Sequence, residues 1–142
     1  MILQNDKRIK TKWIHKEGCA TMAVLWYLNK KKGLQMSPEL VDQYFERLKD
    51  FGAYTDKMLI DWRKAFRAFG SNVFVSYNPI DYRLAPGEFA IGEWYNPKTR
   101  FTHFTAVDGV PGNYICTYDP LGESVTVRDG YLKRLRVFRE AK

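Results

Sequence analysis

The apolar pattern of the chain changes its period near Gly70, and this change constrains the fold more than any other feature. Before Gly70, apolar residues recur at helical spacing. After it, short β-type runs follow one another, separated by turn residues. Helices first and strands afterwards are typical of an α+β fold, with an antiparallel sheet and helices packed to one side. Since the chain has 142 residues, we expect residues 1–142 to form a single domain.

The first two helices have clear boundaries in the sequence. Residues 20–31 are apolar almost throughout and stop before Gly33, which predicts a buried central helix. Ser37-Pro38 predicts the start of the next helix, because serine is a good N-cap and proline is favoured at the first helical position. Its apolar residues recur at helical spacing up to Gly52.

A third helix is expected to begin near Thr55-Asp56 and to end at Gly70. Its apolar stripe would consist of Leu59, Trp62, Phe66 and Phe69.

The second half of the chain predicts a sheet. Five β-type runs are expected as strands, namely residues 72–77, 88–94, 103–109, 113–119 and 123–129. Residues 131–140 fit either a last edge strand or a short helix, and the alternation at Leu135 and Val137 favours the strand.

Cys19 lies at the expected N-terminus of the central helix. The exposed N–H groups and the positive end of the helix dipole favour a thiolate at this place. The same N–H groups can hold an oxyanion after a sulfur has attacked a carbonyl. A single cysteine is more often a small buried apolar residue, so Cys19 needs partners before it indicates catalysis.

His103 and Asp119 supply those partners. His103 begins one predicted strand, where its ring can face a helix N-terminus, and Asp119-Pro120 ends the next strand of the expected hairpin. The carboxylate of Asp119 would then orient the imidazole, as the third member of a catalytic triad does. Each residue alone also fits a structural role beside a turn, but the order of thiol, histidine and aspartate favours a nucleophilic site.

In these residues the chain resembles the papain-like cysteine peptidases, and within them the compact bacterial branch that contains the bacteriocin-processing (double-glycine) peptidase domains of ABC transporters. The matching segments are "GCATMAVLWYL", "APGEFAIGEW", "HFTAVDGV" and "YDPLG". The resemblance implies a papain-like fold, a nucleophile at Cys19, a general base and acid at His103, and an orienting residue at Asp119. The implied substrate is a peptide or protein, and the implied intermediate is an acyl-thioester.

One position departs from that family. Such peptidases usually carry a glutamine about six residues before the cysteine, which donates its amide to the oxyanion, and Trp13 stands here instead. The remaining candidate donors are the backbone of Cys19, the ring of His15 and the amide of Gln4. Losing one such donor typically lowers the rate by about 10²–10³. The alternative is therefore a catalytically inactive papain-like module that binds a peptide or protein partner.

Charge and composition bear on the other functions. The formal net charge of +7 is compatible with a nucleic-acid or anionic-surface partner. The basic residues are scattered along the sequence, however, which favours a solvated surface instead. The two cysteines and two histidines are too far apart in the sequence for a typical zinc site, so no metal and no other cofactor is expected.

The second cysteine, Cys116, has a different expected role from Cys19. Cys116 lies three residues before Asp119, and in a regular strand it would face the other side, which favours a core role over a redox pair with Cys19.

The first residues, "MILQNDKRIKTKW", carry charges where a secretory signal would be apolar, and no apolar run is long enough for a membrane span. We therefore expect a cytoplasmic protein, and export by a route without a classical signal stays open as the alternative. The sequence does not specify the oligomeric state.

Overall fold

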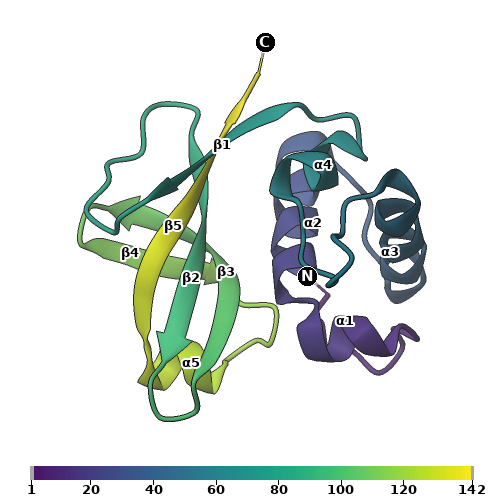
Figure 1. The fold of residues 1–142 in the computed structure, drawn as a ribbon, viewed down its shortest axis with the longest axis horizontal. Helices are drawn as coiled ribbons and strands as arrows, with labels where there is room; N and C mark the ends of the chain where they lie inside the picture. The colour runs from purple at the N-terminus through teal and green to yellow at the C-terminus, as the bar shows by residue number, and fades with distance from the viewer. Residues whose placement is uncertain (1, 142) are drawn as a thin grey trace.

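The computed structural model describes residues 2–141 and consists of a helical half and a sheet half, which lie side by side (Figure 1). The helical half contains α1 (Lys12–Glu17), α2 (Cys19–Lys32), α3 (Pro38–Phe51) and α4 (Trp62–Arg67). The sheet half contains β1 (Val73–Asn78), β2 (Phe89–Asn96), β3 (Phe101–Val110), β4 (Asn113–Tyr118), α5 (Val125–Asp129) and β5 (Tyr131–Glu140). The α+β class expected from the sequence is confirmed.

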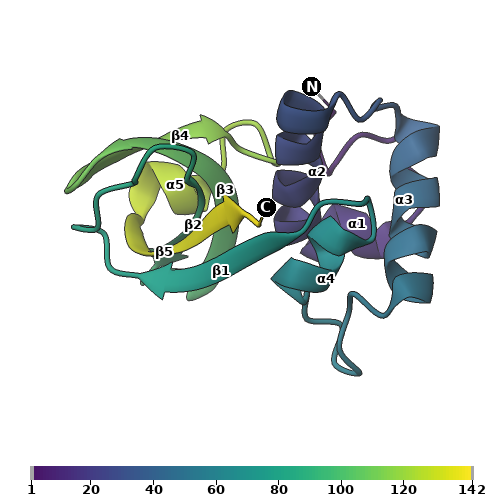
Figure 2. The ribbon, with the colours of Figure 1, turned by 90° about the horizontal axis from the view of Figure 1, so that it is seen from above.

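The sheet is antiparallel throughout and has the strand order β1-β5-β2-β3-β4. Residues 131–140 therefore form a strand, as the alternation predicts, but β5 lies between β1 and β2 rather than at an edge. Seen from above, the sheet curls around α5, and α1–α4 lie on its other side (Figure 2). The edges of the sheet are β1 and β4.

The central helix α2 joins the two halves. It packs against β3, and its residues from Ala20 to Leu25 are all buried. The hydroxyl of Tyr27 donates hydrogen bonds to the carbonyls of Ala90 (2.6 Å) and Val107 (3.2 Å) in the sheet. The prediction of a buried central helix is confirmed, and the start of α2 is fixed relative to the strands. No helix among residues 2–141 combines the length and the apolar character needed to cross a bilayer.

The predicted start of the third helix, near Thr55-Asp56, is wrong. α4 begins at Trp62, because the side chain of Asp61 caps its first turn. The preceding residues form a loop closed by a bridge between Tyr54 and Ile60, with Met58 in the left-handed region (φ 60°). Leu59 does not belong to a helical stripe, since it lies on this loop and is 65% exposed.

Two further elements differ from the prediction. Residues 125–129 form the short helix α5 instead of a strand, because Ser124 accepts a hydrogen bond from the Val127 N–H and caps a helical turn. The run of β-branched residues favours a strand only where neighbouring strands offer partners. The short helix α1, immediately before Cys19, was not predicted at all.

Candidate active site

The break between α1 and α2 sets the position of Cys19. α1 ends at Glu17, Gly18 is the N-cap of α2, and Cys19 is its first residue. A Cβ on Gly18 would lie 2.4 Å from the Ile14 carbonyl oxygen, so glycine allows this close turn. The N–H of Cys19 has no acceptor within α2, because the first N–H groups of any helix lack one. The half-buried Cys19 thus begins a long helix, as the sequence predicts.

Gln4 stabilises this break from the N-terminal segment. Its side-chain Nε2 donates to the carbonyls of Ile14 (3.3 Å) and His15 (3.2 Å). In an uninterrupted helix, the His15 carbonyl would accept from the Cys19 N–H. Both amide hydrogens of Gln4 are engaged in this way, so Gln4 holds the end of α1 rather than offering a donor to an oxyanion. Its backbone N–H also donates to the Pro120 carbonyl (2.8 Å), next to Asp119.

His15 is engaged in the same segment. Its Nε2 lies 3.1 Å from the carbonyl oxygen of Asp6, an acceptor, so this nitrogen donates. The ring therefore holds the N-terminal loop against α1.

His103 and Asp119 are brought together at the end of the β3–β4 ladder. The ladder stops at the pair Ala106 and Tyr118, so the edge of β3 beside His103 is not covered by β4. Asp119 follows directly, and its Oδ1 lies 2.7 Å from His103 Nε2. Both side chains are buried, at 6% and 5% exposure. The hairpin therefore places the two residues as the sequence predicts.

The backbone after β4 holds the carboxylate of Asp119. Its Oδ1 accepts from the N–H of Leu121 (2.9 Å) and its Oδ2 from the N–H of Ser124 (3.0 Å). Burial alone would raise the pKa of Asp119, but the hydrogen bonds from His103 and from these two N–H groups hold it well below its usual range. Asp119 is therefore a fixed anion beside the imidazole.

His103 also interacts with Cys19. Burial alone would lower the pKa of His103, but hydrogen bonds to Asp119 and to the Cys19 side chain, together with their negative charges, raise it to about 9. The thiol of Cys19, the imidazole of His103 and the carboxylate of Asp119 are thus neighbours in one site. With its pKa raised in this way, the imidazole is protonated at neutral pH.

A pocket of about 420 Å³ opens beside Cys19, between the helices and the sheet. Trp13 lines it, and its ring packs against Phe45 and Tyr54 at centroid distances of 5.4 and 5.1 Å. On the sheet side the pocket is lined by Phe104 and Arg136.

Sequence reasoning missed Arg136, although a signal for it exists. Leu135, Arg136, Val137 and Phe138 are consecutive and all buried, so one charged residue interrupts an apolar stretch of β5. A buried arginine requires a partner, and Arg136 Nη1 lies 2.6 Å from Glu93 Oε1.

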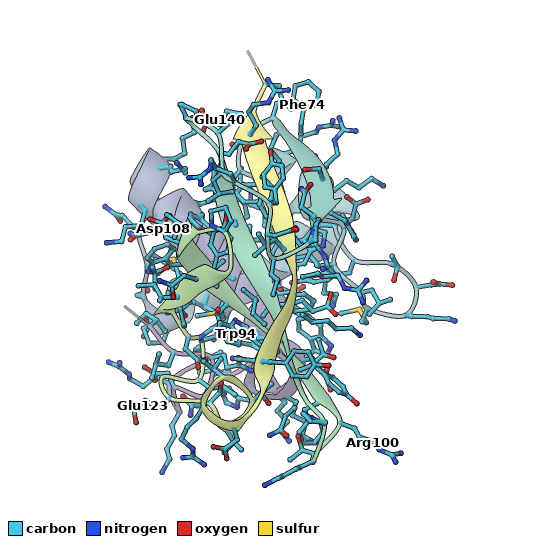
Figure 3. The ribbon with its side chains drawn as sticks, turned by 90° about the vertical axis from the view of Figure 1, so that its left-hand side faces the viewer. Phe74, Trp94, Arg100, Asp108, Glu123 and Glu140 are labelled. Atoms are coloured by element: carbon cyan, nitrogen blue, oxygen red, sulfur yellow. The ribbon has the colours of Figure 1, made fainter. Side chains whose placement is uncertain are left out.

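Trp94 and Cys116 belong to a smaller core with Val107 and Leu135. Trp94 is paired with His103 in the β2–β3 register and donates from Nε1 to Thr105 Oγ1 (2.8 Å). Figure 3, which views the sheet from the side away from α1–α4, labels Trp94 near the middle of the molecule. Burial raises the pKa of the Cys116 thiol, which fits a core position.

The described residues contain no group of three or more metal-ligating side chains close enough together to hold an ion. The candidate site brings a thiol, an imidazole and a carboxylate into one region of the fold, and these groups are used in nucleophilic catalysis.

A family model described as "Protein of unknown function, DUF261" matches residues 1–140, and the chain therefore belongs to this family. No curated protein and no solved structure matches the chain.

Proposed function

We propose that this DUF261 protein is a cysteine peptidase or a related amide hydrolase with a papain-like fold. The observation that carries the proposal is the buried hydrogen bond between His103 and Asp119, on the strand that packs against the helix begun by Cys19. Supporting it, the sulfur lies at the start of a buried 14-residue helix and the imidazole lies on the adjoining strand.

In the acylation step, the Cys19 sulfur attacks the carbonyl carbon of a substrate amide. Asp119 engages Nε2 of His103, so Nδ1 is the ring nitrogen left to face the sulfur. The imidazolium gives its Nδ1 proton to the leaving nitrogen, the C–N bond breaks, and an amine departs. A thioester on Cys19 remains, and Asp119 keeps the ring oriented throughout.

In the deacylation step, water attacks the thioester. Nδ1 of His103 accepts a proton from the water, the C–S bond breaks, and a carboxylic acid leaves. The thiolate–imidazolium pair is then restored. The backbone N–H of Cys19 belongs to the attacking residue itself and is the candidate donor to the developing oxyanion. The start of α2 adds the positive end of the helix dipole.

A second candidate function is a binding module that keeps the fold and lacks the chemistry. Trp13 occupies the position of the usual amide donor and packs into an aromatic cluster. The two other side-chain candidates, Gln4 and His15, are engaged by backbone carbonyls. These contacts favour the alternative, because each missing oxyanion donor typically lowers the rate by about 10²–10³.

A peptide library separates the two candidates. The reduced protein and its Cys19→Ala variant are incubated with a mixture of peptides in ¹⁸O-labelled water, and new termini are detected by mass spectrometry. The proposal predicts new C-termini that carry ¹⁸O and that disappear in Cys19→Ala and in His103→Ala. Peptides that are retained by the protein but never cleaved would support the binding module and contradict the hydrolase.

A further inference from the structure

Two charged side chains of the described residues line the Cys19 pocket, those of Glu17 and Arg136, and of these two only Arg136 is buried. It lies on β5, in the interior of the sheet, and is only 9% exposed. Its guanidinium carbon lies 4.4 Å from the ring centroid of Tyr77 and 5.2 Å from that of Phe104, and all three side chains line the pocket. The two rings fix the guanidinium at the sheet wall.

Arg136 shares its acidic partner with a second arginine and lacks hydrogen bonds. Glu93 Oε1 lies 2.6 Å from Arg136 Nη1 but also 3.4 Å from Nε of Arg134. The contact of Nη1 with Glu93 is not aligned as a hydrogen bond, and Nε of Arg136 has no hydrogen-bond partner among residues 2–141. Two guanidinium groups therefore share one carboxylate, and because Arg134 is exposed to water, the incomplete hydrogen bonding is that of the buried Arg136.

We propose that this pocket recognises a carboxylate of the substrate, held by Arg136 while the amide to be cleaved lies at Cys19. The inference rests on the proposed function for the chemistry at Cys19 and adds the class of substrate, a peptide that carries a carboxylate close to the scissile bond. An arginine fork matches a carboxylate, because its N–H groups form parallel, charge-assisted hydrogen bonds.

The walls of the pocket strengthen such an interaction. Trp62 and Phe104 lie in edge-to-face contact at 5.3 Å and line the pocket with the exposed Leu59 of the loop before α4. Apolar walls exclude water, and charge-assisted hydrogen bonds are stronger in such surroundings. Glu17 is the acidic residue of the same lining, and it is exposed to solvent on α1.

Protection of Cys19 from alkylation measures this recognition without requiring turnover. In a Cys116→Ser background, the rate of labelling by iodoacetamide is measured near pH ~8.5, where an ordinary cysteine also reacts. Four blocked dipeptides compete at millimolar concentration. Acetyl-Leu-Glu-amide and acetyl-Leu-Gln-amide differ in a side-chain carboxylate, and acetyl-Leu-Ala and its amide differ in the terminal carboxylate. The two pairs distinguish an acidic side chain from a free C-terminus.

We expect at least one carboxylate peptide to protect Cys19 about tenfold better than its neutral partner. Arg136→Gln should remove this preference. Glu93→Gln should increase it, and this variant keeps the test falsifiable if Arg136→Gln does not fold. Arg139→Gln is the matched control on the same strand, because Arg139 packs on Phe74. Figure 3 labels Phe74 and the neighbouring Glu140 at the end of the sheet away from Trp94, the residue paired with His103.

Three results would overturn the inference: no protection by either carboxylate peptide, equal protection by both members of each pair, or a preference that survives Arg136→Gln. These results are separate from the fate of the proposed function. Cleavage that depends on Cys19 but ignores carboxylates overturns the inference alone. Protection by carboxylates without any cleavage supports the inference and assigns the pocket to a binding module.

Discussion

Nε2 of His103 lies 2.7 Å from Oδ1 of Asp119, and both residues are buried at the end of the β3–β4 ladder. This contact is made by the half of the chain that forms the sheet, whereas Cys19 belongs to the helical half. The site therefore depends on how α2 packs against β3. Changes in either half should be detected as changes in the reactivity of the Cys19 thiol.

The His103–Asp119 pair should make stability depend on pH in a defined direction. The pKa of His103 is raised from 6.5 to about 9, so its stabilisation is complete below pH 6.5 and is lost as the pH rises through about 9. The pKa of Asp119 is lowered from 3.8, so its contribution is present above pH 3.8 and is lost as the pH falls. Urea unfolding of the parent and of His103→Ala should differ by a few kcal/mol near pH ~6 and by much less near pH ~10. A difference that grows with pH would contradict the assignment.

Asp119→Asn should lower the reactivity of Cys19 at low pH. The amide oxygen still accepts a hydrogen bond from His103, but the negative charge that helps to raise the pKa of His103 is gone. We expect the rate of labelling by iodoacetamide below about pH 7 to fall at least about tenfold. Asp108→Asn is the control, because Asp108 is an exposed residue of β3 that accepts from the Gly109 N–H. An unchanged profile in Asp119→Asn would show that the carboxylate does not act on the imidazole.

Gln4→Leu should affect both stability and the site. It removes two hydrogen bonds to the carbonyls that end α1, next to Cys19. The His15 carbonyl then loses the donor that Gln4 supplies, whereas the Ile14 carbonyl still accepts from the Gly18 N–H. One unsatisfied carbonyl typically lowers the free energy of unfolding by about 1–3 kcal/mol. Urea unfolding should show this loss, and labelling of Cys19 should change with it. His15→Ala removes only the contact with Asp6 and should leave labelling unaltered; equal effects of the two variants would contradict a specific role for Gln4.

Gly18→Ala should move Cys19 by a steric effect. The new Cβ would meet the Ile14 carbonyl oxygen at 2.4 Å, so the turn between α1 and α2 must shift. Gly87→Ala is the matched control, because Gly87 has a left-handed φ of +84° but open space around it, which limits the effect to about 1 kcal/mol of stability. Labelling of Cys19 at low pH should fall in Gly18→Ala and persist in Gly87→Ala. Equal labelling in both variants would show that the turn does not position the sulfur.

The sequence predicted those parts of the fold that local patterns determine. The cap at Ser37, the stop at Gly33 and the alternation in residues 131–140 all correspond to the observed elements. The order of Cys19, His103 and Asp119 indicated their assembly because a hairpin brings neighbouring strands together. The helix start at Thr55-Asp56 was wrong because Asp61 is an equally good cap, and the left-handed Met58 carries no sequence signal.

The pocket could not be predicted, because it depends on contacts between distant segments. Arg136 meets Tyr77 through the pairing of β5 with β1, and Phe104 reaches it from β3. The role of Gln4 depends in the same way on the return of the N-terminal segment to Pro120. Local propensities say nothing about such pairings, so only the folded chain reveals them.

We propose that His103 activates Cys19, and the pH profile of Cys19 alkylation measures this activation. Labelling by iodoacetamide is measured in Cys116→Ser and in the same protein with His103→Ala added. We expect rapid labelling that persists well below pH ~7 and disappears without His103, because a thiolate–imidazolium pair reacts where an ordinary thiol, with a pKa near ~8.5, does not. Slow labelling that follows an ordinary thiol profile, and that is the same in both proteins, would contradict it.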